Sequence, residues 1–146
     1  MPKLKPSDRK ALEKAGVAPK LIDSLVPEFS KVPRKKMTGL EIEFTQVLET
    51  WKSQGQIDAW YREPFKVCLG AASQKTGRRT WYMPDFVAIK RMGSWANITA
   101  YETKGHERED DRVKLKVAAK LYPWIRWVMV KKINGRFEYE GFGNGI

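Results

Sequence analysis

Apolar residues after position 37 first recur at the spacing of an amphipathic helix. The stripe consists of Leu40, Phe44, Val47, Leu48 and Trp51. This i, i+4, i+7, i+8, i+11 pattern predicts a helix with one buried face. Thr38 can cap its N-terminus, and the pattern ends before Gly55. Glu41 and Glu43 fall on opposite margins of the stripe, so periodicity leaves open which of them faces the sheet edge.

The remaining apolar runs are shorter and favour strands. Phe65, Val67 and Leu69 alternate with other residues, which is typical of a strand. The expected strands cover residues 57–69, 80–89, 95–104, 125–130 and 137–142. A short turn at 90–94 favours antiparallel pairing of the second and third strands. Asn134-Gly135 predicts a hairpin turn between the last two.

Three further helices complete the expected fold. One covers residues 109–121, and its acidic first turn and basic body suit the helix dipole. Its buried face is expected to consist of Val113, Val117, Ala118 and Leu121. Two short helices, at 7–15 and 19–25, precede a proline- and lysine-containing linker and predict a helical appendage over 1–36. We therefore expect an α/β domain over 37–146, with a mixed β-sheet flanked by helices, and an N-terminal helical appendage.

Charge points to the partner. The 146 residues suffice for one domain, and 28 Lys and Arg against 17 Asp and Glu give a formal net charge of +11. Such a positive charge favours a phosphate-rich partner. A membrane surface is the alternative partner, and it is less favoured because the sequence has no long apolar run. The N-terminus has no hydrophobic leader, and Cys68 is the single cysteine. These features predict a cytoplasmic protein without an internal disulfide.

Two segments carry candidate chemistry. Met83-Pro84-Asp85-Phe86 precedes Tyr101-Glu102-Thr103-Lys104-Gly105, and Glu102 follows Asp85 by 17 positions. Glu102 and Lys104 are two residues apart and point to the same face of a strand. Two carboxylates and an ammonium are what a metal-dependent phosphodiester cleavage centre needs.

The alternative interpretation gives these motifs no catalytic role: Pro84 would form a turn, Asp85 would be solvated, and Glu102 and Lys104 would be an exposed ion pair. It is less favoured because Asp85 lies within an apolar run, where unpaired carboxylates are rarely tolerated. Lys104 can orient the attacking water, deprotonate it, or neutralise charge on the phosphate. Gly105 predicts a close backbone approach or a sharp turn after the strand.

The ordered motifs resemble the phage endonuclease I family, the junction-resolving branch of the PD-(D/E)xK nucleases. The matching segments are Thr38-Gly39-Leu40-Glu41, Pro84-Asp85-Phe86, Glu102-Thr103-Lys104-Gly105, Asp110-Asp111-Arg112-Val113-Lys114 and Pro123-Trp124-Ile125-Arg126-Trp127-Val128. The resemblance covers about residues 38–130. It implies a PD-(D/E)xK nuclease-like core, and it favours Glu41 over Glu43 as a further catalytic carboxylate.

The expected function is that of a structure-selective endonuclease. Asp85, Glu102 and the backbone carbonyl of Thr103 would bind Mg²⁺, with Mn²⁺ as a substitute, while Glu41 completes the site and Lys104 orients the water. The sequence has no recognition-helix or zinc-finger pattern, so we expect the enzyme to recognise DNA shape, as in four-way junctions. The alternatives are a less selective nicking or degrading nuclease and a non-catalytic DNA-binding protein on the same fold.

Basic residues near these motifs are the expected DNA contacts. They are Arg34, Lys35, Lys36, Lys75, Arg78, Arg79, Lys90, Arg91, His106, Arg108, Arg112, Lys114 and Lys116. Of these, His106 could also be a general base, although a loop residue touching phosphate is the simpler interpretation. Trp81 and Trp95, near turns, are expected aromatic contacts. Resolving a junction needs two symmetric incisions, which predicts a homodimer. The connector at 70–79 is read as a loose loop, a basic arm across the duplex, or a bridge for strand exchange.

Overall fold

A computed structural model describes Lys14, Gly16 and residues 35–106 and 108–143 of the chain. The chain divides into two units, Met1–Lys36 and Met37–Ile146. The expected N-terminal helices at 7–15 and 19–25 lie outside the described residues, apart from Lys14, which is helical. Arg34 also lies outside them. No helix in the described part of the chain is long and apolar enough to span a membrane.

The larger unit is built on a mixed sheet of five strands, which confirms the predicted mixed sheet flanked by helices. In chain order the elements are α3 (Gly39–Ser53), β1 (Ala59–Arg62), β2 (Val67–Cys68), β3 (Trp81–Tyr82), β4 (Phe86–Met92), β5 (Trp95–Thr103), α4 (Glu109–Leu121), β6 (Ile125–Ile133) and β7 (Arg136–Phe142). The strand order is β1-β4-β5-β6-β7, while β2 and β3 form a separate two-stranded sheet. Within the large sheet β5 and β6 run parallel, joined through α4, and the other pairs are antiparallel.

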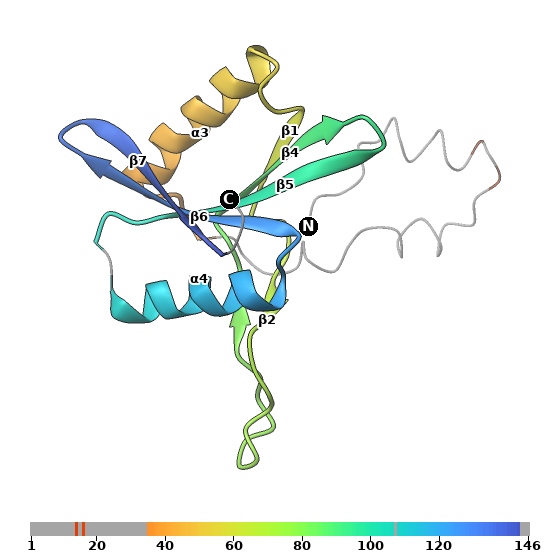
Figure 1. Cartoon of the computed structure of the whole chain (residues 1–146), viewed down its shortest axis with the longest axis vertical. Helices are drawn as coiled ribbons and strands as arrows, with labels where there is room; N and C mark the ends of the chain where they lie inside the picture. The colour runs from red at the N-terminus through yellow and green to blue at the C-terminus, as the bar shows by residue number, and fades with distance from the viewer. Residues whose placement is uncertain (1–13, 15, 17–34, 107, 144–146) are drawn as a thin grey trace. The chain divides into compact units, whose positions relative to one another are not determined.

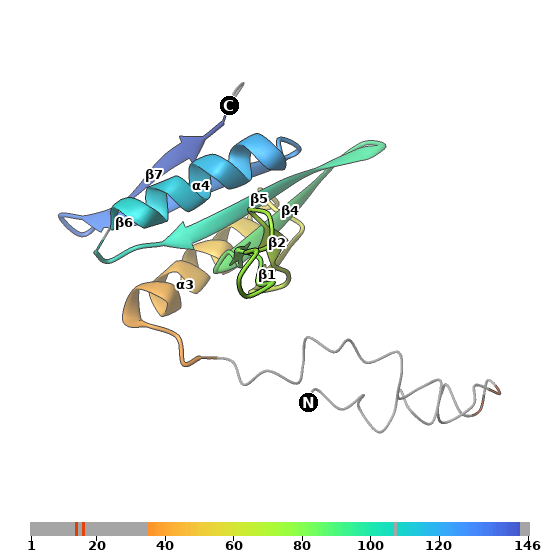
Figure 2. The same ribbon diagram turned by 90° about the horizontal axis from the view of Figure 1, so that it is seen from below.

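The two helices lie on opposite faces of this sheet, as Figure 2 shows. Phe44 and Leu48 of α3 are fully buried in a cluster with Phe86, Ala88, Val128 and Val130 of the strands. Leu115, Ala118 and Ala119 of α4 pack into a second cluster with Val87, Ala100, Trp127 and Met129. The sheet therefore has a core on each face, and α3 and α4 lie on either side of it (Figure 1).

Helix α3 begins and ends close to the predicted positions. Thr38 is the N-cap, its side chain accepts from the backbone N–H of Glu41, and the Glu41 side chain accepts from the backbone N–H of Thr38. This reciprocal capping box satisfies two N–H groups that a helix start leaves without partners. The buried residues Phe44 and Leu48 belong to the predicted stripe.

Helix α4 has the predicted bounds, and Ala118 of its predicted buried face is buried, but Val113 and Leu121 of that face are not. Val113 and Leu121 are 53% and 47% exposed, whereas Leu115, Ala118 and Ala119 are buried. The sequence contains both stripes, because Leu115, Ala118 and Ala119 also follow i, i+3, i+4 spacing. The face with two alanines lets the helix backbone come close to the sheet: an added Cβ at Gly143 would lie 3.3 Å from that of Ala119.

Two of the predicted strands are each broken in two. The segment 57–69 forms β1 and β2, which belong to different sheets and are separated by Glu63, with φ of 44°, and Pro64. The segment 80–89 forms β3 and β4, with Pro84 in the gap. Proline cannot donate to a strand ladder, so pairing stops at both places. Asp85 consequently sits in a bend that leads into β4.

The hairpin turns follow their glycines. Met92 pairs with Trp95, so the predicted turn at 90–94 shrinks to Gly93 and Ser94, and Gly93 takes a positive φ of 69°. At the predicted turn between β6 and β7, Asn134 and Gly135 have φ of 50° and 76°. Two consecutive positive φ values define the tight hairpin that Asn-Gly favours. Strand β6 runs on to Ile133 before it, three residues past the predicted end.

Candidate active site

Asp85, Glu102 and Lys104 meet at one end of the central strands. The last antiparallel pair between β4 and β5 is Phe86 with Tyr101, so Asp85 and Glu102 occupy the next step beyond it. Lys104 follows the end of β5 directly, and its backbone N–H donates to the carbonyl of Val130 on β6 at 2.9 Å. Residues that are far apart in sequence are thus placed together by strand pairing.

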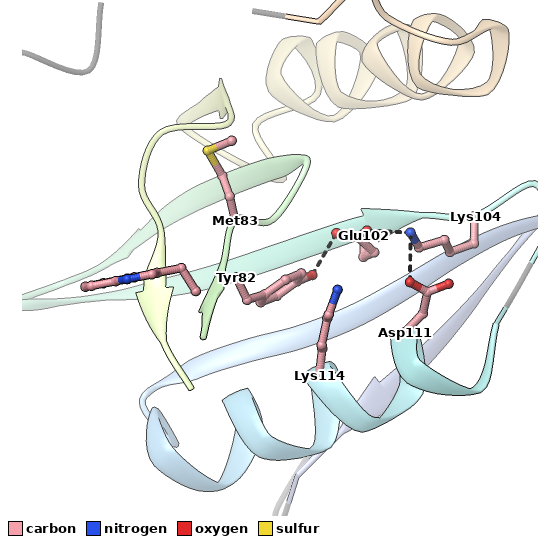
Figure 3. A pocket seen from close by; sticks show the side chains of 7 residues that line it. Tyr82, Met83, Glu102, Lys104, Asp111 and Lys114 are labelled. Carbon is pink, nitrogen blue, oxygen red and sulfur yellow. Dashed lines mark hydrogen bonds and ion pairs between the residues drawn. The ribbon is translucent and has the colours of Figure 1, made fainter. Parts of the chain in front are cut away.

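Glu102 is the most enclosed of these groups, with 8% of its surface exposed. The hydroxyl of Tyr82 donates to Oε2 of Glu102 at 2.7 Å. On the other side, Nζ of Lys104 lies 2.9 Å from Oε1. Figure 3 shows Tyr82 and Lys104 approaching the carboxylate from opposite sides. Burial of a carboxylate is tolerated here because both of its oxygens have a partner.

Lys104 also contacts helix α4. Its Nζ lies 3.2 Å from Oδ1 of Asp111, and Oδ2 of the same aspartate accepts from the backbone N–H of Arg108 at 3.0 Å. Asp111 therefore links the start of α4 to the site lysine. Burial acts to lower the pKa of Lys104, but Glu102 and Asp111 outweigh it and hold this pKa above the ordinary value. At neutral pH Lys104 is an ammonium, which suits it to orient a water or neutralise charge rather than to accept a proton.

Asp85 is held on the other side of the site by Thr103. Its Oδ2 accepts from the backbone N–H and from the hydroxyl of Thr103, each at 2.8 Å. Burial and then the charge of Glu102 raise the pKa of Asp85 to about 7, although the bonds from Thr103 act in the opposite direction. Glu41 adds a smaller increase. Carboxylates crowded in this way resist ionising together, and a bound cation relieves that repulsion.

A cavity of about 210 Å³ opens beside these groups. It is lined by Trp81, Tyr82, Met83, Glu102, Lys104, Asp111 and Lys114. Lys114 extends from α4 toward the same space (Figure 3). Burial and the neighbouring Glu102 raise the pKa of Tyr82, so its hydroxyl stays protonated and keeps donating to the carboxylate. The cavity wall thus combines two ammonium groups with carboxylate and phenol oxygens.

The donor set fits a hard divalent cation with few protein ligands. The described residues contain no group of three or more His, Cys, Asp and Glu placed to hold a metal. Mg²⁺, however, is commonly held by one or two carboxylates and keeps several waters. Asp85 and Glu102 supply such a pair. Thr103 contacts Asp85 through its N–H and hydroxyl, and a role of its carbonyl as a ligand stays a prediction.

The two helix glutamates have separate surroundings. Glu41 caps α3, and its charge acts on Asp85. Glu43 instead forms an ion pair with Lys132 on β6. The structure thus connects Glu41, and not Glu43, electrostatically to the site. The capping contact also shows that Glu41 has a structural task of its own.

The expected DNA contacts are distributed widely. Those that are exposed in the described residues are Lys35, Lys36, Lys75, Arg78, Arg79, Arg91, His106, Arg108 and Lys116. Lys90 donates to the carbonyl of Gly55 at 2.7 Å, and Arg112 donates to both carboxylate oxygens of Glu140. Lys90 and Arg112 therefore have structural partners, whereas Lys114 lines the cavity. Trp81 and Trp95 are 48% and 59% exposed, as expected for contact residues.

Sequence reasoning did not place Tyr82 and Asp111 in the site. Tyr82 read as one more apolar residue of a strand, and nothing in its spacing from Glu102 reveals the contact. The sequence did indicate that Asp111 could lie near Lys104, since Asp111 belongs to the acidic first turn of a helix that begins a few residues after Lys104. Of the two expectations for Gly105, the turn is observed as a bend in the chain, whereas a close approach is not, because an added Cβ would meet nothing within 4 Å.

Comparisons with known proteins add little to this geometry. No protein-family model and no curated protein matches the chain. A solved structure described as "Crystal structure of SSO0001" is similar with a TM-score of 0.43 and 13% identity, over 96% of this chain and 60% of that one. The chain thus spans less than two thirds of that protein's length, and function is argued from the site itself.

Proposed function

We propose that this protein is a metal-dependent endonuclease that hydrolyses phosphodiester bonds in DNA, with branched DNA such as a four-way junction as its substrate. The observation that carries the proposal is the meeting of Asp85, Glu102 and Lys104 at one end of the central strands, where Glu102 lies beside Lys104 and its charge acts on Asp85. Glu102 and Lys104 also line one cavity. An arrangement of α3, a mixed sheet and α4 that brings these motifs to one strand end is compatible with the nuclease-like core that the motifs imply.

Each group has a defined task in this proposal. Asp85 and Glu102 would hold Mg²⁺, or Mn²⁺ in its place, and the ion supplies a Lewis acid and a water of lowered pKa. Lys104, as an ammonium, donates toward the phosphate or the water and offsets the negative charge that develops there. Tyr82 fixes the orientation of Glu102. Glu41 adds negative charge near Asp85 and so strengthens its attraction for a cation.

The charge of the molecule supports a nucleic-acid substrate. A formal net charge of +11 attracts a polyanion and predicts binding that weakens steeply with salt. Shape recognition follows from the sequence, which offers no base-reading module. The surface cations on the described residues are spread over several elements rather than gathered on one groove-reading helix.

A cleavage assay tests the proposal. Four-way junction, linear duplex and single-stranded DNA are each incubated with the protein in Mg²⁺ and in EDTA. We expect the junction to be cleaved in Mg²⁺ and not in EDTA. The cleavage rate should fall at least about a hundredfold in each of the variants Asp85→Asn, Glu102→Gln and Lys104→Ala. Equal cutting of all substrates would instead favour a less selective nuclease. Binding without cutting in any metal would favour a non-catalytic DNA-binding protein.

A melting experiment checks the metal site without relying on activity. Mg²⁺ that binds the folded state should raise the melting temperature of the wild-type protein, and above the dissociation constant the rise should grow with the logarithm of the Mg²⁺ concentration. Asp85→Asn should lose this response. A response to Mg²⁺ that is unchanged in Asp85→Asn would place the cation elsewhere.

A further inference from the structure

A long hairpin stands at the edge of the candidate site. Residues 66–82, called the basic hairpin below, include β2 and β3, which pair through Val67 with Tyr82 and Cys68 with Trp81. Beyond the strands the backbone stays paired, from Leu69 N–H to the Thr80 carbonyl and from Ser73 N–H to the Arg78 carbonyl, each at 2.8 Å. Figure 1 shows this segment projecting away from the large sheet. It is an ordered hairpin, not the loose loop that its composition allowed.

The basic hairpin carries charge of one sign. No acidic residue occurs between Glu63 and Asp85, while Lys66, Lys75, Arg78 and Arg79 are all cations. Every residue from 70 to 81 is exposed. The segment therefore contributes little to the core, and in a chain with 17 acidic residues its lack of them leaves the cations unneutralised by neighbours in sequence.

The base of the hairpin is anchored directly to the site. On one strand, Tyr82 is buried and donates to Glu102, and Trp81 lines the same cavity. On the other strand, the carbonyl of Cys68 accepts from the hydroxyl of Tyr122 at 2.8 Å. The ammonium of Lys66 lies 5.0 Å from the centre of the Trp81 ring. The position of the hairpin is thus set by the residues that also set the site.

The reach of the hairpin matches a short stretch of duplex. Gln74 at the tip lies five positions beyond Leu69, which at about 3.3 Å per residue gives a length of roughly 17 Å. A duplex rises about 3.4 Å per base pair, so this length spans about five base pairs.

We propose that the basic hairpin lies along the phosphate backbone of duplex DNA on one side of the scissile bond and holds it through Lys75, Arg78 and Arg79. This rests on the proposed function, because it assigns part of the substrate to a surface beyond the cavity. An anionic membrane is disfavoured as the partner, since the exposed segment from Gly70 to Gly77 has no bulky apolar residue to insert between lipids.

Binding in EDTA separates this proposal from catalysis. Fluorescence anisotropy with a junction bearing long duplex arms is measured across a salt series. Lys75→Ala/Arg78→Ala/Arg79→Ala should lower the slope of log affinity against log salt by about two to three, as expected for the loss of three phosphate contacts. The matched control, Lys52→Ala/Lys120→Ala/Arg126→Ala, removes the same charge from exposed positions on α3, α4 and β6 and should leave the slope nearly unchanged.

Hydroxyl-radical footprinting gives a second measurement. The wild-type protein should protect the region of the junction and about five further base pairs on one side, and the hairpin variant should lose only that extension. A variant that failed to fold would lose the whole footprint, and its thermal melt would show this. Lys75→Gln/Arg78→Gln/Arg79→Gln, which keeps a polar side chain at each position but removes the charge, should give the same shortened footprint.

Each other outcome overturns the proposal in a recognisable way. Equal slope changes in both triple variants would mean that only total charge matters, and would overturn the hairpin contact alone. A wild-type protein that binds no DNA would overturn the proposed function and the contact together. Hairpin-dependent binding to phosphatidylserine vesicles without any hairpin effect on DNA would assign the surface to lipid instead.

Discussion

Ionised Asp85 destabilises the folded protein in the absence of a metal. Its pKa rises from 3.8 to about 7, so the folded protein holds this proton more tightly than the unfolded chain does. In the absence of metal, the contribution of Asp85 to the free energy of unfolding is therefore fully present below pH 4, and it is lost as the pH rises through 7. At about 1.4 kcal/mol per pKa unit, the cost above pH 7 is on the order of a few kcal/mol.

Asp85→Asn should remove this cost, because an amide oxygen can still accept from Thr103. We expect the variant to melt above the wild type at pH 8 in EDTA, with a gain that shrinks as pH falls toward 4. Thermal melts across this range, at constant ionic strength, measure the difference. A variant less stable than the wild type at pH 8 would contradict the conclusion that ionised Asp85 destabilises the metal-free protein.

Asp111 should act on the reaction through Lys104. Asp111→Asn removes one of the two negative partners of the ammonium, while its amide oxygen can still accept from Arg108. The pKa of Lys104 should then fall, and the alkaline limb of the rate–pH profile should move to lower pH, while the rate at neutral pH, where Lys104 stays an ammonium, should change little. The control is Asp110→Asn, an exposed neighbour in the same turn of α4. An unchanged profile for Asp111→Asn would leave it a helix cap only.

For single residues, the sequence predicts which side chains could carry the chemistry better than it predicts which residues contact them. Asp85, Glu102 and Lys104 could be selected because a strand alternates faces and because a carboxylate in an apolar run needs a reason. Tyr82 and Asp111 could not, since their contacts depend on how β3 and α4 pack against β5. The protonation state of Lys104 is also a tertiary property, set by two carboxylates from different elements.

At the scale of elements, helix α3 offers a paired test of its two glutamates. Glu41→Gln should preserve the capping box, because glutamine also serves at this position, yet remove a charge that acts on Asp85. We expect cleavage to slow while stability stays within about 0.5 kcal/mol of the wild type. Glu43→Gln loses an exposed ion pair to Lys132, so its stability should change by less than about 1 kcal/mol and its cleavage rate should not change.

The cleavage rate and the melting temperature are measured for both variants and compared with those of the wild type. If Glu43→Gln slowed cleavage and Glu41→Gln did not, the margin of α3 that faces the site would have been assigned wrongly.

The elements differ in how far the sequence determines them. The bounds of α3 and α4 follow from local signals, namely a capping threonine, acidic first turns and the apolar period. Two of the strands were predicted too long, because the apolar pattern continues through Glu63-Pro64 and Pro84 although strand pairing stops there. Which face of α4 is buried depends on the close approach of two alanines to the sheet, and alanine carries little weight in a hydrophobic pattern.

At the scale of the whole molecule, the mixed sheet follows from connection lengths. A two-residue turn joins β4 to β5 as an antiparallel pair, while the helical connection through α4 allows β6 to run parallel to β5. This combination brings the end of β5 and the start of α4 together, which is where Lys104 and Asp111 meet. One such site occurs in the described part of the chain.

Resolution of a four-way junction therefore predicts a homodimer. Two symmetric incisions require two centres, and a C₂ pair of chains supplies them with a single interface. Light scattering coupled to size exclusion should give twice the mass of the 146-residue chain, and cleavage per protomer should fall on dilution below the dimer dissociation constant. In a cruciform plasmid, paired cuts should yield linear product within one binding event, whereas a mixed dimer with one Asp85→Asn protomer should release nicked circles. A stable monomer that still made paired cuts would contradict this arrangement, because each incision would then have to come from a separate encounter or from one site acting twice.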